Sequence, residues 1–77
     1  MYKYSVFVEM LKNEDSVAYT AYGIVVCSME DNERKEVLKI SDVSSDKSRV
    51  EKLVDLCNKE QLEPVHIYDV IEDFLYS

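Results

Sequence analysis

The spacing of apolar residues changes once along the chain, and this change limits the possible folds more than any other feature of the sequence. As far as residue 40, apolar and polar residues tend to alternate, which is typical of strands that bury one face. From residue 48 onwards, apolar residues recur every three or four positions, which is typical of amphipathic helices. Strands followed by helices, in the order β-β-β-α-α, predict an α+β fold in a single domain over residues 1–77.

Three strands and their turns can be placed in the first part of the chain. The strands are expected over residues 2–11, 17–29 and 34–40. Gly23 stands in the middle of the second strand, where it predicts a bulge or a close approach of another backbone segment. Asp31 and Asn32 tolerate positive φ angles, so they can close the second hairpin. The third strand is short and carries Lys35 and Lys39, which suits the edge of a sheet.

Two helices are expected in the second part of the chain. Ser48 followed by Glu51 fits a capping box, and Ser45 or Asp46 would serve as an earlier N-cap. The apolar stripe of the first helix consists of Val50, Leu53, Val54 and Cys57. Pro64 suits the first turn of the second helix. The stripe of that helix consists of Ile67, Val70, Ile71, Phe74 and Leu75. Both helices are expected to pack on one face of a three-stranded antiparallel meander.

Two helices can cover only one face of such a sheet, yet the second strand is apolar on both sides. One face of the first strand carries Tyr2, Tyr4, Val6, Val8 and Met10. If that face meets the helices, an apolar face remains, and such faces are usually hidden from water. We therefore expect a homodimer, packed sheet on sheet or paired through edge strands, or contact with a different protein. The residues expected at this contact are Phe7, Leu11, Tyr22 and Ile24. The alternative is a monomer with scattered exposed apolar residues.

The charge of the chain excludes one class of partner. Among its 77 residues, 16 are acidic and 9 are lysine or arginine, which gives a net charge of −7. Affinity for nucleic acids depends on clustered lysine and arginine, so no nucleic-acid partner is expected. The acidity is uneven, because residues 1–41 have a net charge of −2 and residues 42–77 have a net charge of −5.

The sequence also suggests where the protein works. Its longest uninterrupted apolar run, Ile24–Cys27, is far shorter than the roughly 20 residues of a membrane-spanning helix. The N-terminus lacks the basic and apolar regions of a signal peptide. Cys27 and Cys57 fall on apolar faces and are expected to be buried free thiols rather than a disulfide. We therefore expect a cytoplasmic protein without a membrane partner.

The second helix carries His66, Asp69 and Asp73 at positions that share one helix face. Such a set could hold a divalent metal or serve acid–base catalysis. A metal site needs ligands from several elements, so a metal-dependent enzyme would also require an acid such as Asp42 or Asp46. A solvated acidic face is the favoured interpretation, docking of a basic partner is the alternative, and no metal or cofactor is expected.

Catalysis has little support in the sequence, and no enzyme activity is expected. Cys27 and His66 are the one Cys–His pair conceivable near the core, and no basic neighbours in the sequence activate either thiol. Gly23 is the single glycine, so there is no Gly-rich phosphate loop. We expect a non-catalytic protein-interaction or regulatory module that self-associates. The alternative is a small-ligand-binding module with a pocket between sheet and helices or at a dimer seam, and a metal-dependent enzyme comes third.

Several short motifs together resemble a family of short bacterial proteins known only as a domain of unknown function. The motifs are Tyr4-Ser5-Val6, Tyr22-Gly23-Ile24, Ile40-Ser41-Asp42, Cys57-Asn58 and Pro64-x-His66-x-x-Asp69-Val70-Ile71-Glu72-Asp73-Phe74-Leu75. The last motif is the most distinctive. The resemblance implies a small cytoplasmic bacterial protein and brings with it no activity, substrate or catalytic residue.

Overall fold

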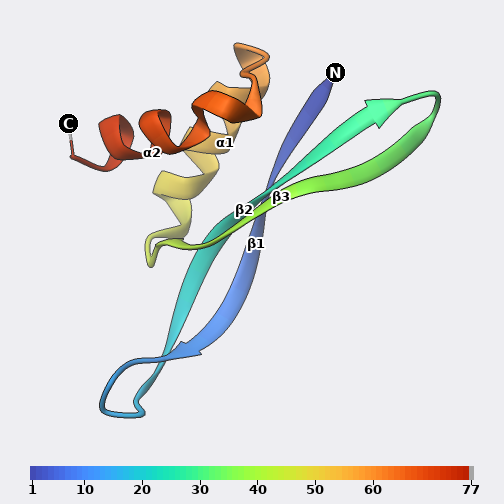
Figure 1. The fold of residues 1–77 in the computed structure, drawn as a ribbon. Helices are drawn as coiled ribbons and strands as arrows, with labels where there is room; N and C mark the ends of the chain where they lie inside the picture. Colours follow the sequence, from blue (N-terminus) through green and yellow to red (C-terminus); the bar gives the residue numbers. More distant parts are fainter. Residues whose placement is uncertain (77) are drawn as a thin grey trace.

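The computed structural model describes residues 1–76 and consists of three strands followed by two helices (Figure 1). The elements are β1 (Tyr2–Lys12), β2 (Ala18–Glu30), β3 (Glu33–Ser44), α1 (Lys47–Lys59), a short 3₁₀ turn η1 (Pro64–His66) and α2 (Ile67–Tyr76). The predicted α+β class and the β-β-β-α-α order are confirmed. None of the helices in the described part of the chain is long and apolar enough to cross a membrane.

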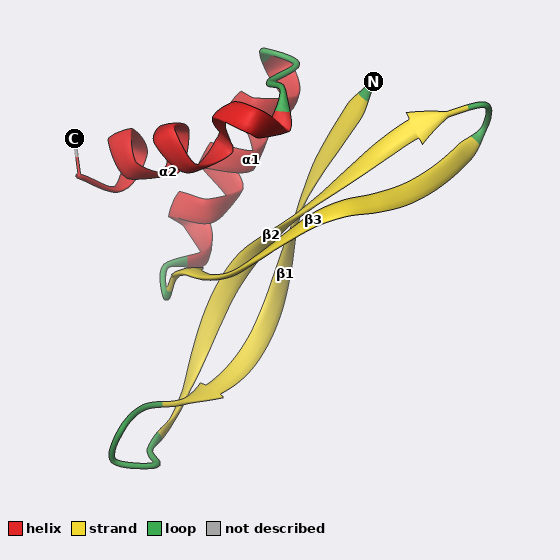
Figure 2. Cartoon of the chain, viewed as in Figure 1, coloured by secondary structure: helices red, strands yellow, loops and turns green. Residues whose placement is uncertain are grey.

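The strands form one antiparallel sheet in the order β1-β2-β3. The pairing of β1 with β2 runs without interruption from Tyr2 opposite Ser28 to Lys12 opposite Ala18. Both β1 and β3 are edge strands. The hairpin ends of the sheet extend past the helices in both directions (Figure 2), so part of each strand has no helix above it.

The β2–β3 hairpin closes with the predicted two-residue turn. Asp31 and Asn32 have φ angles of 51° and 65°, as a type I′ turn requires. The third strand is longer than expected, because β3 continues to Ser44, which pairs with Tyr22. Residues 41–44, which follow the expected end of this strand, therefore still belong to the sheet.

Gly23 lies where β3 departs from regular pairing. Ile24 pairs with Ile40 whereas Tyr22 pairs with Ser44, so β3 bulges opposite Gly23. A Cβ atom at Gly23 would collide with the Ile40 carbonyl oxygen and would lie 2.5 Å from a ring carbon of Phe7. The predicted bulge and the predicted close approach are both confirmed, and glycine is needed because a neighbouring backbone fills the space of its missing side chain.

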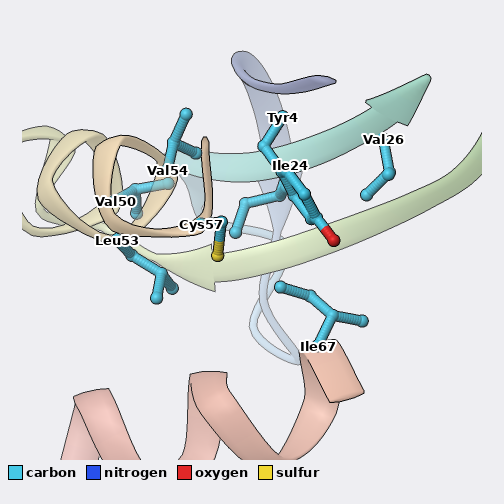
Figure 3. Packing of buried hydrophobic residues seen from close by; sticks show 8 residues of the cluster. All are labelled: Tyr4, Ile24, Val26, Val50, Leu53, Val54, Cys57 and Ile67. Atoms are coloured by element: carbon cyan, nitrogen blue, oxygen red, sulfur yellow. The ribbon is translucent and has the colours of Figure 1, made fainter. Parts of the chain in front are cut away.

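The hydrophobic core lies between one face of the sheet and the helices (Figure 3). Its buried members are Tyr4, Ile24 and Val26 from the sheet, Val50, Leu53, Val54 and Cys57 from α1, and Ile67 from α2. All four apolar residues predicted for the stripe of α1 are therefore buried. Helix α2 reaches the core through Ile67, and its remaining apolar residues are only partly buried.

Helix α1 is fixed to the edge of β1 by one side chain. The Tyr4 backbone N–H donates to Asn58 Oδ1 at 2.8 Å, and Asn58 Nδ2 donates to the Tyr4 carbonyl at 2.9 Å. The Asn58 amide thus bonds to β1 as the backbone of a neighbouring strand would. The Tyr4 hydroxyl donates to the Leu62 carbonyl at 2.6 Å, which also holds the chain beyond α1.

The ends of the helices show which of the alternative caps is used. Asp46 is the N-cap of α1, and its side chain accepts from the Arg49 N–H at 3.4 Å. At the C-terminal end of α2, the carbonyls of Phe74 and Leu75 accept from an Arg49 guanidinium nitrogen of α1, at 3.3 Å and 3.2 Å. The last turn of α2 has no basic residue of its own, so α1 supplies the positive charge that favours this end of the α2 dipole.

We predict that Asn58→Ala destabilises the protein by about 2 kcal/mol, because two buried backbone groups of Tyr4 lose their partners. The free energy of unfolding is measured by urea denaturation. Lys52→Ala, at an exposed position of α1, is the control and should change it by less than about 0.5 kcal/mol. Equal effects of the two substitutions would show that the Asn58 contact is not needed.

We predict that Gly23→Ala costs about 2 kcal/mol of stability, because the added methyl group overlaps the Ile40 carbonyl and the Phe7 ring. In the double variant Gly23→Ala/Phe7→Leu, the side-chain overlap is relieved but the backbone overlap remains. The second substitution should therefore recover only part of the loss in a urea denaturation series. Full recovery would contradict the role given to the Ile40 backbone.

Candidate functional site

The outer edge of β1 carries backbone groups that β2 does not use. In an antiparallel pair, successive residues alternate between bonding to the neighbouring strand and pointing away from it. The N–H and C=O of Tyr4 point away from β2, as their hydrogen bonds to Asn58 show. The same alternation directs the backbone N–H and C=O groups of Val6, Val8 and Met10 to the outer edge. Beyond the Asn58 contact, β1 is therefore a free edge.

Val8 and Met10 are also exposed through their side chains. They lie on the face of the sheet that carries the helices, in register with Tyr22 and Thr20 of β2. Tyr2, Tyr4 and Val6 on this face pack against the core. Val8 and Met10 remain 63% and 67% exposed, because the helices end before they reach this part of β1. The predicted apolar face of the first strand exists, but the helices cover only its first half.

A groove runs beside this edge, between the sheet and α1, with a volume of about 550 Å³. We call it the β1 groove. Its residues are Val6, Val8 and Tyr22 from the sheet and Lys47, Glu51, Val54 and Asp55 from α1. The sheet side of the groove is thus mainly apolar, whereas the helix side is mainly charged.

The helix wall of the β1 groove has an excess of negative charge. Glu51 and Asp55 stand one helical turn apart, and Lys47 is the one basic residue in the wall. Lys47 Nζ lies 4.0 Å from Glu51 Oε1, with both side chains largely exposed. Such a surface pair contributes little to stability. The wall therefore favours a positively charged group in any molecule that enters the groove.

The opposite face of the sheet is covered by its own side chains and not by a helix. The Tyr19 hydroxyl donates to Asp42 Oδ2 at 2.9 Å, which raises the pKa of Tyr19. Glu9 Oε2 accepts from Ser41 Oγ at 2.7 Å and from the Asp42 N–H at 2.8 Å. Ala21, which pairs with Glu9, is completely buried. This polar network spans all three strands and shields the middle of the face.

The four residues predicted to form a sheet-face contact do not lie together. Phe7 and Leu11 lie on the face without helices, and Lys39 Nζ sits 4.6 Å from the centre of the Phe7 ring. Tyr22 and Ile24 face the helices, and Ile24 is fully buried in the core. Their assignment to the same contact as Phe7 and Leu11 is wrong, because the register places them opposite Val8 and Val6 on the other side of the sheet.

The predicted acidic helix face is exposed, and its residues belong to two elements. His66 ends the 3₁₀ turn, whereas Asp69 and Asp73 lie within α2. All three side chains are exposed. Across residues 1–76, no group of three or more His, Cys, Asp or Glu side chains is placed to hold a metal ion. This arrangement fits the interpretation as a solvated face.

Both cysteines are free and buried, as the sequence predicted. Cys57 is the last core residue of α1, whereas Cys27 pairs with Lys3 on the face without helices. Burial raises the pKa of the Cys57 thiol to about 11. This thiol is therefore protonated near neutral pH, and its side chain packs in the core.

Val8 and Met10 are the residues of this site that sequence reasoning assigned to the covered face. A signal for their exposure is present in the sequence, since β1 carries no lysine, arginine or proline between Tyr4 and Leu11. Natural edge strands usually carry such residues to prevent pairing with other chains. The absence of such residues is therefore the sequence signal for a free edge at β1.

Comparison with known proteins identifies one family. A model of a family described as "Family of unknown function (DUF6514)" matches residues 1–77, the whole chain. The resemblance to a family of unknown function is thereby confirmed. Neither the curated proteins nor the solved structures include a significant match.

We predict that the protein loses stability as the pH rises from about 9 to about 12. Burial raises the pKa of Tyr4 from 10.0 to about 12 and that of Cys57 from 9.0 to about 11. The folded protein then holds protons that the unfolded chain releases, so this stabilisation is complete below pH 9 and lost at higher pH.

Urea denaturation at a series of pH values measures this effect. Tyr4→Phe should flatten the upper part of the decline and should also lower stability at neutral pH, because the Leu62 carbonyl loses its donor. Tyr68→Phe, at an exposed position, is the control and should leave the pH profile unchanged. An unaltered profile for Tyr4→Phe would contradict the assignment.

Proposed function

The chain belongs to this family of unknown function, and we propose from its structure that the protein is a non-catalytic binding module whose β1 edge takes up an extended polypeptide segment. The segment adds to the sheet as a further strand and places alternate side chains in the β1 groove. Binding thus depends on the backbone groups and the shape of the β1 edge, and not on a reactive side chain.

The difference between the two edges of the sheet carries this proposal. Edge strand β3 has the features that prevent pairing, namely two irregularities in register and the basic residues Arg34, Lys35 and Lys39. Edge strand β1 has an uninterrupted register, and from Val6 to Leu11 it contains no basic residue and no proline. A small sheet that protects one edge and leaves the other open is suited to strand addition at the open edge.

The geometry of β1 supplies both affinity and selectivity. Val6, Val8 and Met10 each offer one N–H and one C=O to an added strand. Alternate side chains of that strand would point to the groove side, where Val6 and Val54 provide an apolar surface. The acids of the α1 wall favour a basic residue in the segment. The expected ligand is therefore an extended segment with apolar residues at alternate positions and a base near one end.

A second candidate function uses the same groove. A volume of about 550 Å³ lies within the range of small-molecule sites, which is roughly 300–1,000 Å³. A small ligand with an apolar body and a positive group would fit the apolar sheet side and the acidic helix wall of the β1 groove. This candidate needs no backbone pairing, so it differs from strand addition in its dependence on the β1 edge.

The non-catalytic role and the location in the cell are inferred from individual side chains. Tyr4 and Cys57, whose pKa values burial raises, are held in the core, and Tyr19, whose pKa is also raised, donates its hydroxyl to Asp42. These contacts support a non-catalytic role without a cofactor. Two buried free thiols suit a reducing compartment, so we propose a cytoplasmic location.

Peptide selection tests strand addition directly. Random extended peptides are selected against the protein, and one selected peptide is titrated into the ¹⁵N-labelled chain. We expect the largest amide shifts at Val6, Val8 and Met10. Val8→Pro should weaken binding roughly tenfold or more, because it removes one outward N–H while the ladder to β2 keeps its bonds.

Val8→Ala is the matched control, because it shortens the same side chain and keeps the backbone N–H. Circular dichroism verifies that both variants fold. Equal peptide affinity for Val8→Pro and the original chain would rule out strand addition. A compound that binds the groove with equal affinity in both variants would instead support the small-ligand candidate.

A further inference from the structure

We infer that the segment taken up by the β1 edge is β1 of a second copy of this chain. The two strands pair antiparallel about a two-fold axis at Val8 and join two sheets into one. This inference rests on the proposed strand addition and names its partner. It differs from packing sheet on sheet, for which the face without helices is poorly suited, because a polar network from Glu9 to Asp42 covers it.

The positions of the free backbone groups permit this symmetry. Outward groups occur at Val6, Val8 and Met10, which are spaced evenly about Val8. In an antiparallel pair centred there, Val8 exchanges two hydrogen bonds with Val8 of the second copy. Val6 exchanges two with Met10 of the second copy, and Met10 with its Val6. Each chain presents the same surface, as a two-fold interface requires.

The Asn58 contact sets the length of this interface. Tyr4 is the next outward residue after Val6, and its N–H and C=O are already bonded to Asn58. A strand from a second copy must therefore stop pairing at Val6. In the register centred on Val8, this limit applies symmetrically to both chains, so paired residues run from Val6 to Met10.

The groove receives a side chain of matching chemistry in this register. Met10 of the second copy lies opposite Val6 and points to the side that carries the helices. It therefore lies next to Val6 of the sheet and faces Val54 of α1, the apolar residue of the helix side of the groove. Met10 is 67% exposed in the single chain, and a flexible thioether side chain adapts well to an irregular groove. The dimer thus buries a residue that the single chain leaves in water.

The charges near the edge are compatible with self-pairing despite the net charge of −7. Glu9 is the single charged residue between Val6 and Leu11, and it bonds to Ser41 and Asp42 on the face away from the groove. Lys12 of the second copy follows the paired segment, two residues after its Met10, on the side of the α1 wall that carries Glu51 and Asp55. A basic residue of β1 thus meets the acidic wall of α1.

The resulting sheet has six strands and no unprotected edge. Its order is β3-β2-β1-β1-β2-β3, so each outer edge is the irregular and basic strand β3. Pairing with a second copy thereby removes the single open edge and also prevents further growth of the sheet. A closed dimer, and not a filament, is the expected product.

Analytical ultracentrifugation at micromolar concentration tests this inference on the whole chain. We expect the mass of two chains, twice the 9.0 kDa of one. Val8→Lys should give single chains, because two lysines would meet at the two-fold axis. Val37→Lys makes the same change at a 45% exposed position of edge strand β3 and should remain a dimer.

Cross-linking provides a second measurement that does not depend on the behaviour of Val8→Lys. In the proposed register the two Val8 Cα atoms lie about 5.5 Å apart, within the range of a disulfide. Val8→Cys should therefore cross-link to a covalent dimer under a mild oxidant, whereas Val37→Cys should form the dimer without a covalent cross-link. Native Cys27 and Cys57 are buried and should not contribute.

The outcomes separate this inference from the proposed function. A single chain at all concentrations would overturn pairing with a second copy, while peptide binding at the β1 edge would leave strand addition intact. A dimer that persists in Val8→Lys and does not cross-link through Val8→Cys would place the interface elsewhere and overturn the inference. A single chain that also fails to bind any selected peptide would reject both.

Discussion

The pair of hydrogen bonds between Asn58 and Tyr4 determines much of the remaining structure. It joins residues 54 positions apart. It also provides hydrogen-bond partners for the N–H and C=O of Tyr4, which lie on the outer side of an edge strand, where the sheet has no further strand. It also fixes the end of α1 on β1, which places the apolar stripe of the helix over Ile24 and Val26. Where this contact ends, the free part of the edge begins. One amide side chain thus defines both the anchored half and the open half of β1.

The sequence predicted the local structure well, because local patterns depend on nearby residues. Alternation predicted the strands, and Gly23 and the Asp31-Asn32 turn were confirmed in detail. The faces of β2 could not be assigned, since a strand with apolar residues on both sides does not reveal which side meets the helices. Ile24 was therefore grouped with Phe7, although the register separates them. The extension of β3 was missed because Ser41, Asp42 and Ser44 are polar and the strand bulges there, so the apolar alternation does not continue.

The candidate site was harder to predict than the fold, because it depends on the relative lengths of elements. The 13 residues of α1 span about 20 Å at 1.5 Å per residue, whereas the 11 residues of β1 span about 36 Å at 3.3 Å per residue. A strand longer than the helix above it must leave part of its apolar face uncovered. Val8 and Met10 occupy that part. The Asn58 contact, in contrast, joins residues 54 positions apart, and no local pattern indicates it.

The contact of Arg49 with the end of α2 has a consequence for motion. Helix α2 has ten residues, one fully buried side chain and no basic residue in its last turn, so it depends on α1 for its stability. Isolated helices of this length are marginal in water. Helix α2 should therefore open as a separate unit at a lower free energy than global unfolding, and its amides should exchange with solvent before those of the sheet. We therefore expect the C-terminal helix to open while the three-stranded sheet stays folded.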